Sequence, residues 1–166
     1  MDRKKFLINS TLAGGSLFML SSFKGEPQTS VFTIEEIYEF VAAAHSNLEK
    51  TKKIVDAKPL ILNATSQVVQ GDFETALGGA SHMGRRDIAD LLILRGARMD
   101  IFSLTFLGYT DFVRKQITTY PHLLNSYGPH GFTLLHHAKV GKHKELANWF
   151  INQGLIIERN KDVFNE

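Results

Sequence analysis

The sequence predicts an all-α fold, a solenoid of about four helix-turn-helix repeats joined by short hairpin loops. Three observations predict it: recurring segments, apolar faces at helical spacing, and glycine or proline where helices should end. Apolar residues make up 43% and charged residues 22% of the 166 residues, a composition typical of globular domains. We expect a signal segment at 1–24, a linker at 25–32, a repeat domain at 33–158 and a polar tail at 159–166 that frays.

Residues 1–24 have the pattern of an export signal. A charged start at residues 2–5 precedes an uncharged stretch at residues 6–23. Its dense apolar part, Leu12–Leu20, has the length of a signal-peptide core. Arg3-Lys4-Lys5-Phe6-Leu7 resembles the twin-arginine export motif, with Lys4 in place of the second arginine.

This segment predicts export to the periplasm. The departure at Lys4 keeps the ordinary secretory route open. Two alternatives remain, a cytoplasmic protein and a protein anchored in a membrane through an uncleaved segment 1–24.

The charge of the predicted mature domain argues against nucleic-acid binding. The whole chain has a formal net charge of +2. Without residues 1–24, which hold Arg3, Lys4, Lys5, Lys24 and Asp2, 15 basic and 16 acidic residues remain. A nucleic-acid-binding domain carries a strongly basic face. We therefore expect no nucleic-acid partner, and no membrane contact unless segment 1–24 stays attached.

Several features recur at similar separations in the rest of the chain. The pattern P-x-[IL]-L-N occurs at residues 59–63 and 121–125, which are 62 positions apart. Thr75-Ala76-Leu77 and Thr133-Leu134-Leu135 are 58 positions apart. Both separations are close to twice a period of about 33 residues, which indicates repeated helix pairs.

Residues that link or end helices give the expected helix pairs in order. The positions that link the two helices of each pair are Ser46, Gly84, Gly108 and Lys142, at spacings of 38, 24 and 34 residues. Within the second pair, Ile88, Leu91 and Leu92 share one helix face. Two prolines, Pro59 and Pro121, follow the second helices, which they cannot continue. Glycine stands where a helix ends in the left-handed conformation, which is easiest for a residue without a Cβ. These glycines are Gly84, Gly96, Gly108 and Gly154.

The junctions between pairs differ in length. The junction between the second and third pairs is about nine residues shorter than the repeat period. The junction between the first and second pairs has gained several residues, Thr65–Asp72.

These features resemble the ankyrin-repeat family, bacterial members in particular. Residues 131–138 (GFTLLHHA) are similar to the family's G-x-TPLHxA opening, with Leu134 in place of proline. Residues 74–100 match a repeat well, with Ala76 for proline and Gly78 for histidine, whereas residues 102–125 match half a repeat and residues 40–63 match weakly. The resemblance covers roughly residues 33–157 and implies stacked helix pairs.

No motif predicts catalysis or metal binding. The chain lacks cysteine, H-E-x-x-H, G-x-S-x-G and a phosphate-binding loop. The resemblance places His136 at the TPLH position, where it would join Thr133 in a hydrogen-bond network, and gives His143 a structural role too. We therefore predict no catalytic residues, no metal and no cofactor.

The resemblance also implies a partner surface, because ankyrin stacks bind through hairpin tips and the exposed side of each first helix. The candidate contact residues are Tyr127, His130, His82, Met83, Phe106 and His137. Met83 and Phe106 fit a core position equally well.

The predicted function is a non-catalytic, monomeric protein–protein interaction module with an unidentified protein partner. The alternative is a small periplasmic protein that binds a metal or small molecule, or an enzyme, using the histidine-rich fourth repeat. That repeat holds His136, His137 and His143, with His130 just before it.

Overall fold

The computed structural model describes residues 32–67 and 69–164. The predicted signal segment 1–24 and linker residues 25–31 lie outside the described residues. Within the described part, no helix has the length and apolar character needed to cross a membrane.

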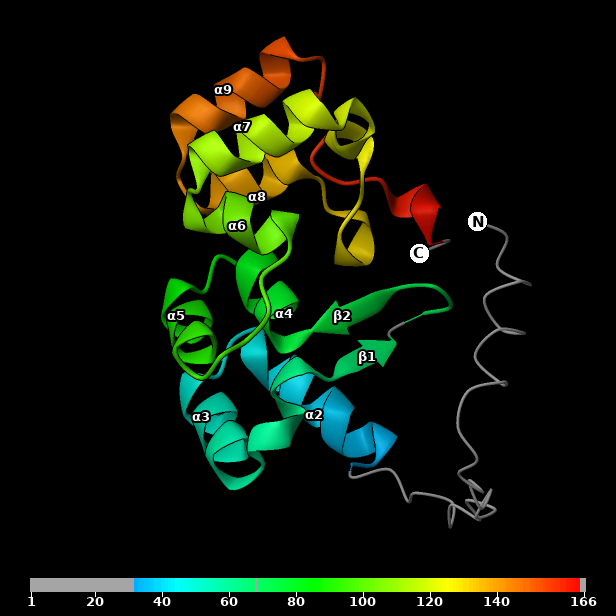
Figure 1. Ribbon diagram of the computed structural model, residues 1–166. Coiled ribbons are helices and arrows are strands. Elements are labelled where there is room, and N and C mark those ends of the chain that lie inside the picture. Colours follow the sequence, from blue (N-terminus) through cyan, green and yellow to red (C-terminus); the bar gives the residue numbers. More distant parts are fainter. Residues whose placement is uncertain (1–31, 68, 165–166) are drawn as a thin grey trace, which may run out of the picture. The chain divides into compact units, whose positions relative to one another are not determined.

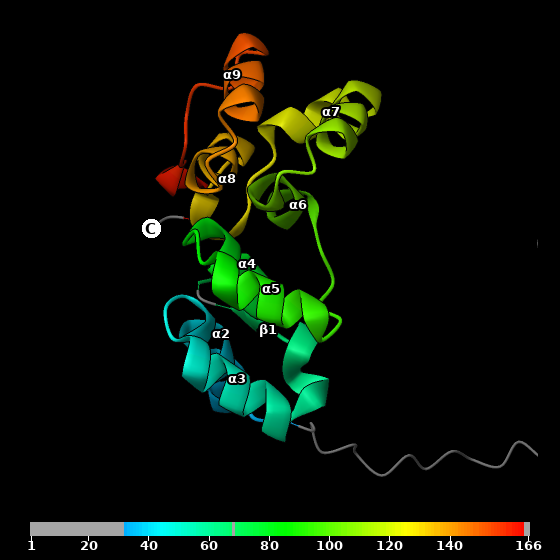
Figure 2. The same cartoon turned by 90° about the vertical axis from the view of Figure 1, so that its left-hand side faces the viewer.

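The described residues form four helical hairpins, so the prediction of a mostly helical fold is confirmed. The first helices α2, α4, α6 and α8 contact one another in chain order (Figures 1 and 2). Each pairs with the helix that follows it. The pairs are α2 (Ile34–Ala44) with α3 (Leu48–Ala57), α4 (Ala76–His82) with α5 (Arg86–Leu94), α6 (Ile101–Leu107) with α7 (Thr110–Thr119), and α8 (Leu134–Val140) with α9 (Lys144–Asn152).

Local sequence signals account for where these helices begin. Thr33, Thr75 and Thr133 each precede a first helix, and each hydroxyl accepts a hydrogen bond from a backbone N–H in the first turn. Asp100 does the same for α6. Such caps satisfy N–H groups that have no partner inside the helix.

The predicted helix ends are confirmed. Ser46, Gly84, Gly108 and Lys142 all lie in the short links within the hairpins. Gly108 ends α6 with a φ of 87°, a conformation that favours glycine. The two P-x-[IL]-L-N segments form matching 3₁₀ turns, η1 (Pro59–Asn63) after α3 and η2 (Pro121–Asn125) after α7.

The lengthened first junction forms a small β-hairpin, which the all-α prediction did not include. Strand β1 (Thr65–Gln67) pairs antiparallel with β2 (Phe73–Thr75), and Ser66 lies opposite Glu74. The flanking residues of both strands are more exposed, so these two central side chains point inward. The shortened second junction is a plain connection between α5 and α6.

The described part of the C-terminal tail, residues 159–164, contacts the loop before α8. Thr133 Oγ1 donates to the carbonyl of Ile157 at 2.7 Å, and the N–H of Asn160 donates to the carbonyl of Gly131 at 2.9 Å. The 3₁₀ turn η4 (Lys161–Val163) contacts η3 (Pro129–Gly131), which precedes α8. The tail therefore supports the loop that carries His130.

The core consists of two apolar clusters. One lies mainly in the first two hairpins, contains Phe40, Ile61, Ile88 and Leu92, and extends to Phe106 of α6. The other lies in the last two and contains Val113, Leu134, Leu146 and Phe150. Ile88 and Leu92 are fully buried, as their helical spacing predicts.

Candidate functional site

Three of the six predicted contact residues are buried, so they are wrong as surface contacts. His82, Phe106 and His137 are only 4%, 2% and 0% exposed. Each lies on a first helix, and every first helix packs against at least one neighbouring first helix as well as its own hairpin partner. Burial lowers the pKa of His137 to about 3, so this ring is neutral and its Nδ1 donates to the carbonyl of Thr133 at 2.8 Å.

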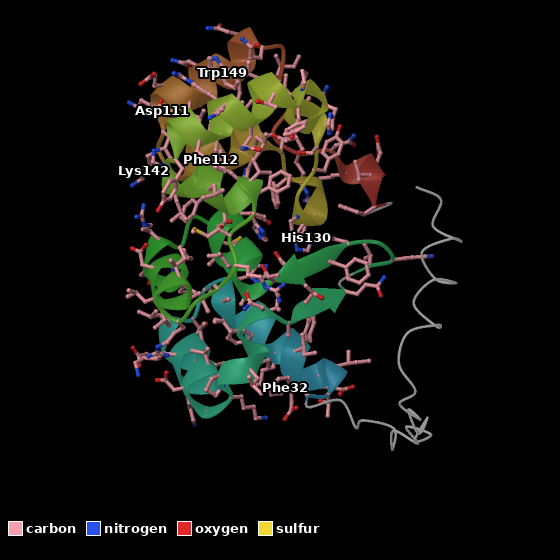
Figure 3. The ribbon with its side chains drawn as sticks, viewed as in Figure 1. Phe32, Asp111, Phe112, His130, Lys142 and Trp149 are labelled. Carbon is pink, nitrogen blue, oxygen red and sulfur yellow. The ribbon has the colours of Figure 1, made fainter. Side chains whose placement is uncertain are left out.

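The other three predicted residues are at least partly accessible. Met83 is 52% exposed at the end of α4. Tyr127 is half-buried, and its hydroxyl accepts a hydrogen bond from Asn160 Nδ2 at 3.4 Å. His130 is also half-buried and lies beside the β-hairpin (Figure 3).

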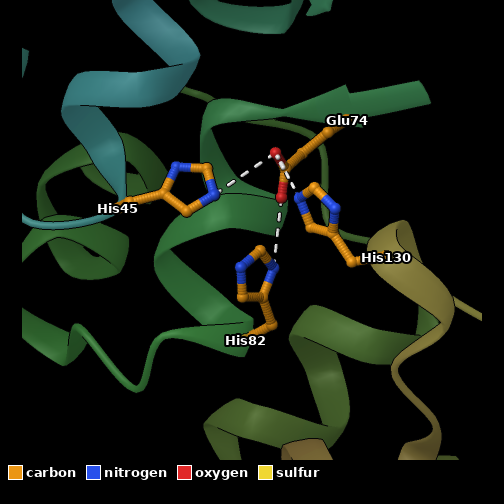
Figure 4. A group of neighbouring side chains, drawn as sticks. All are labelled: His45, Glu74, His82 and His130. Atoms are coloured by element: carbon orange, nitrogen blue, oxygen red, sulfur yellow. Dashed lines mark ion pairs between the residues drawn. The ribbon is translucent and has the colours of Figure 1, made fainter. Parts of the chain in front are cut away.

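His130 belongs to a cluster of four side chains that sequence reasoning did not assemble. We call His45, Glu74, His82 and His130 the His–Glu cluster (Figure 4). One potential ligand atom from each residue lies within 4.8 Å of the others. His45 caps α2, Glu74 lies in β2, His82 ends α4 and His130 lies in η3.

Glu74 is at the centre of the His–Glu cluster. Its Oε2 lies 3.4 Å from Nε2 of His45 and 3.5 Å from Nε2 of His130, and its Oε1 lies 3.1 Å from Nδ1 of His82. Burial alone raises the pKa of Glu74, but His45 and His82 outweigh burial and hold the pKa at about 2. The carboxylate is therefore ionised at neutral pH.

The contact between Glu74 and His82 is close without being a hydrogen bond. Oε1 of Glu74 and Nδ1 of His82 are buried, and neither has a hydrogen-bond partner among the described residues. The His82 ring is stacked 5.0 Å from the Phe132 ring, and its exposed fraction is 2%. Within the described part of the chain, these two buried polar atoms are therefore paired only with each other, as an ion pair at 3.1 Å, although buried polar atoms are normally satisfied by hydrogen bonds.

His45 is oriented by its own helix. Its Nδ1 lies 2.9 Å from the carbonyl of Val41, which leaves Nε2 to face Glu74. The Glu74 carboxylate raises the pKa of His45 above its usual value, against the opposing effect of burial. Gly79 lies directly against this ring, since a Cβ built there would be 2.8 Å from Cε1 of His45.

His130 is held by contacts on both sides of its peptide. Its φ is 56°, in the left-handed region. Its N–H donates to Oδ2 of Asp72 at 3.0 Å, and its carbonyl accepts from Nε of Arg159 at 2.7 Å. Nδ1 of its ring lies 3.4 Å from the same Asp72 oxygen, so Nε2 is the nitrogen turned to Glu74.

A pocket of about 240 Å³ opens beside the His–Glu cluster, and we call it the Tyr38 pocket. Its walls are formed by Tyr38, Val41, Ala42, His45, Ser66, Glu74 and His130. A larger pocket of about 650 Å³ lies on α2 and α3, but it has no histidine and a rim of exposed lysines and glutamates. Of these two pockets, the Tyr38 pocket is therefore the one that adjoins the His–Glu cluster.

Two other histidines bridge different hairpins, His136 from the fourth to the second and His143 from the fourth to the third. Nε2 of His136 lies 2.8 Å from the carbonyl of His82, and Nε2 of His143 lies 2.8 Å from the carbonyl of Phe106. Thr133 accepts the backbone N–H of His136 at 3.4 Å, rather than its ring.

The His–Glu cluster escaped sequence analysis because its members follow no metal-binding spacing. One signal was available: His45 and His82 lie at the same end of the first helices of successive hairpins, at the C-cap of α2 and in the last position of α4. Side chains at the same end of stacked units lie close together. Glu74 and His130 come from junctions, where the repeat pattern makes no such prediction.

Comparison with known proteins finds no matching family model and no matching curated protein.

Proposed function

We propose that this protein binds one divalent transition-metal ion through His45, Glu74, His82 and His130. The observation that carries the proposal is the convergence of four donor atoms from three parts of the repeat array. Two of them, Glu74 Oε1 and His82 Nδ1, are buried without a hydrogen-bond partner among the described residues.

The donor set and its spacing fit such an ion. Imidazole nitrogens with a carboxylate oxygen are ligands suited to zinc and neighbouring transition metals. Ligand atoms about 2.1 Å from a tetrahedral zinc lie about 3.4 Å from one another. From Glu74, Oε2 lies 3.4 and 3.5 Å from Nε2 of His45 and His130, and Oε1 lies 3.1 Å from Nδ1 of His82. The four ligand atoms lie within 4.8 Å of one another, so they would draw together slightly around an ion.

The surroundings of the rings support the same proposal. A histidine that binds a metal usually donates its other ring N–H to a carbonyl or carboxylate, which fixes the tautomer. Val41 offers a carbonyl to Nδ1 of His45, and Asp72 offers a carboxylate to Nδ1 of His130. Both rings are therefore preset to present Nε2 toward Glu74.

We further propose that the scaffold is an ankyrin-like repeat solenoid. The support is the order of contacts among α2, α4, α6 and α8, together with the threonine caps before three of them. On this scaffold, His45 belongs to the first hairpin and His82 to the second, while His130 precedes the fourth.

Metal analysis of the full-length, tag-free protein tests the proposed function. After loading with zinc and removal of free metal, we expect about one ion per chain. The variant His45→Asn should bind at least tenfold more weakly, while His122→Asn, which changes an exposed histidine outside the cluster, should bind normally. A wild-type content below about 0.1 ion per chain refutes the proposal, because a built site fills under these conditions.

A protein-binding role is the second candidate, favoured by the partly exposed Met83 and Tyr127 on an array of helical hairpins. The test is a pull-down with the full chain and with the double variant Met83→Ala, Tyr127→Ala. A partner that both baits retain equally would place the interaction on another surface.

The proposed compartment is the periplasm, on the strength of the charged start and apolar stretch in residues 1–24. Sequencing of the mature N-terminus tests it. Cleavage near residues 21–28 supports export, whereas an intact chain in the soluble cytoplasm contradicts it.

A further inference from the structure

The His–Glu cluster has a closed side and an open side. His45, Glu74 and His130 contribute to the wall of the Tyr38 pocket, whereas His82 does not. The side chains of His45 and His130 are 25% and 19% exposed, but those of Glu74 and His82 are only 1% and 2% exposed. An ion among these four residues would be enclosed by Glu74 and His82 and reachable from the Tyr38 pocket.

The charge of a loaded cluster would favour an anion on the open side. A divalent ion with one glutamate and three neutral imidazoles carries a net charge of about +1. Among the described residues, no lysine or arginine lines the Tyr38 pocket. Asp72 is fully buried behind His130 and is not part of the pocket wall. The ion itself would therefore be the positive group presented to a ligand.

The walls of the Tyr38 pocket restrict the size and character of that ligand. The volume of about 240 Å³ is below the range of about 300–1,000 Å³ that holds drug-sized molecules. Val41 and Ala42 form an apolar wall, and Ser66 and Tyr38 supply hydroxyl groups. A small molecule with a short aliphatic chain and one carboxylate matches both the apolar wall and the hydroxyl groups.

We propose that the metal-loaded His–Glu cluster keeps one exchangeable coordination position facing the Tyr38 pocket, and that a small carboxylate anion binds there. This inference rests on the proposed function, metal binding. It adds a fifth coordination position, so that the ion is open to a ligand rather than closed by the four protein donors alone.

Visible spectroscopy of the full-length protein loaded with cobalt(II) tests the inference. Metal content is measured first, and the protein is then titrated with acetate and with isobutyrate at constant pH and ionic strength. We expect a saturable change in the cobalt absorption bands with both anions, because a new oxygen ligand changes the coordination geometry. Chloride at the same ionic strength serves as the control anion.

A pair of variants tests the position of the ligand. Ala42→Phe fills the Tyr38 pocket from an exposed position of α2, and Ala57→Phe makes the same change at an exposed position of α3 outside it. We expect Ala42→Phe to bind isobutyrate at least tenfold more weakly with its cobalt content unchanged. Ala57→Phe should behave as wild type.

The outcomes separate the two proposals. A chain that takes up no cobalt refutes the proposed function. A chain that holds cobalt but shows no spectral change with either anion has a closed site, and this overturns the inference alone. Equal isobutyrate affinity in wild type and Ala42→Phe, with cobalt bound, overturns the assignment to the Tyr38 pocket.

Discussion

At the scale of single residues, His130 shows how backbone conformation serves the His–Glu cluster. Its φ of 56° places it in the left-handed region, which costs a non-glycine residue about 1–3 kcal/mol. Asp72 and Arg159 hold the peptide on its two sides. The conformation persists because surrounding contacts determine it, and it directs the ring toward Glu74.

The variant His130→Asn should separate the backbone role from the ligand role. Asparagine tolerates the left-handed region well, so the loop should keep its shape while the imidazole is lost. We expect the melting temperature of the metal-free protein to change by less than about 4 °C. Zinc affinity, measured by competition with a chelator, should fall at least tenfold. Unchanged zinc affinity would remove His130 from the set of ligands.

Glu74 makes stability depend on pH in the metal-free protein. Its pKa is about 2 in the folded chain against 4.5 ordinarily, so its contribution is full above pH 4.5 and is lost as pH falls toward 2. The raised pKa of His45 acts in the opposite sense, since its contribution is full below pH 6.5 and is lost as pH rises. Both contributions are present at pH 5.

We therefore expect the stability difference between wild type and Glu74→Gln to shrink by more than about 1 kcal/mol between pH 5 and pH 3.5. Urea unfolding of the metal-free proteins at both pH values measures it. A difference that stays constant would mean that the Glu74 carboxylate has an ordinary pKa.

At the scale of elements, helix α4 determines how closely the histidines of the His–Glu cluster approach one another. All seven of its residues are buried, and it contacts α2, α5, α6 and α8. Small residues fill its centre, Gly78-Gly79-Ala80-Ser81, which lets neighbouring helices pack closely. His45 rests against Gly79 for this reason.

Two alanine substitutions in α4 should differ in their effect on metal binding. The added Cβ of Gly79→Ala would meet the His45 ring at 2.8 Å, so the ring must move and zinc affinity should fall about tenfold. The added Cβ of Gly78→Ala would meet Oγ1 of Thr75 at 3.3 Å, and it would touch the cluster only at an ordinary van der Waals distance, 3.7 Å from Cγ of Glu74. Gly78→Ala should therefore keep its zinc affinity. Isothermal titration of both variants decides the point, and equal affinities would show that His45 is not a ligand.

At the scale of the whole molecule, the His–Glu cluster joins the first two hairpins to the loop before α8, in addition to the apolar contact made through Phe106 of α6. Phe40, Ile88 and their neighbours form one apolar cluster and Leu134, Phe150 and their neighbours another. His45 and His82 belong to the hairpins of the first, whereas His130 leads into α8 of the second. An ion bound by all of them would hold the two halves together.

Zinc should therefore stabilise the protein as a whole. At a free concentration one hundred times its dissociation constant, a ligand of the native state adds about 2.7 kcal/mol. For a chain of this size, the melting temperature should rise by roughly 5–10 °C. A thermal scan with zinc and with chelator measures the shift, and His45→Asn, with its weaker binding, should show a clearly smaller shift. Equal shifts in the two proteins would indicate binding elsewhere.

The sequence by itself determined the helical hairpins and their boundaries. Left-handed glycines such as Gly108 and the two P-x-[IL]-L-N segments after the second helices lie where the pattern predicted. These signals act between residues a few positions apart, so they can be interpreted without knowing the fold. They could not show which side of each first helix would be covered, and His82, Phe106 and His137 were consequently misplaced on the surface.

Only the tertiary structure decided the His–Glu cluster. His45 and His130 are 85 positions apart, and Glu74 faces them because an inserted β-hairpin turns its side chain inward opposite Ser66. Bringing such distant donors within 4.8 Å depends on how hairpins stack and on how the C-terminal tail supports the loop of His130. Local propensity determines the elements of this protein, whereas long-range packing determines the site they form.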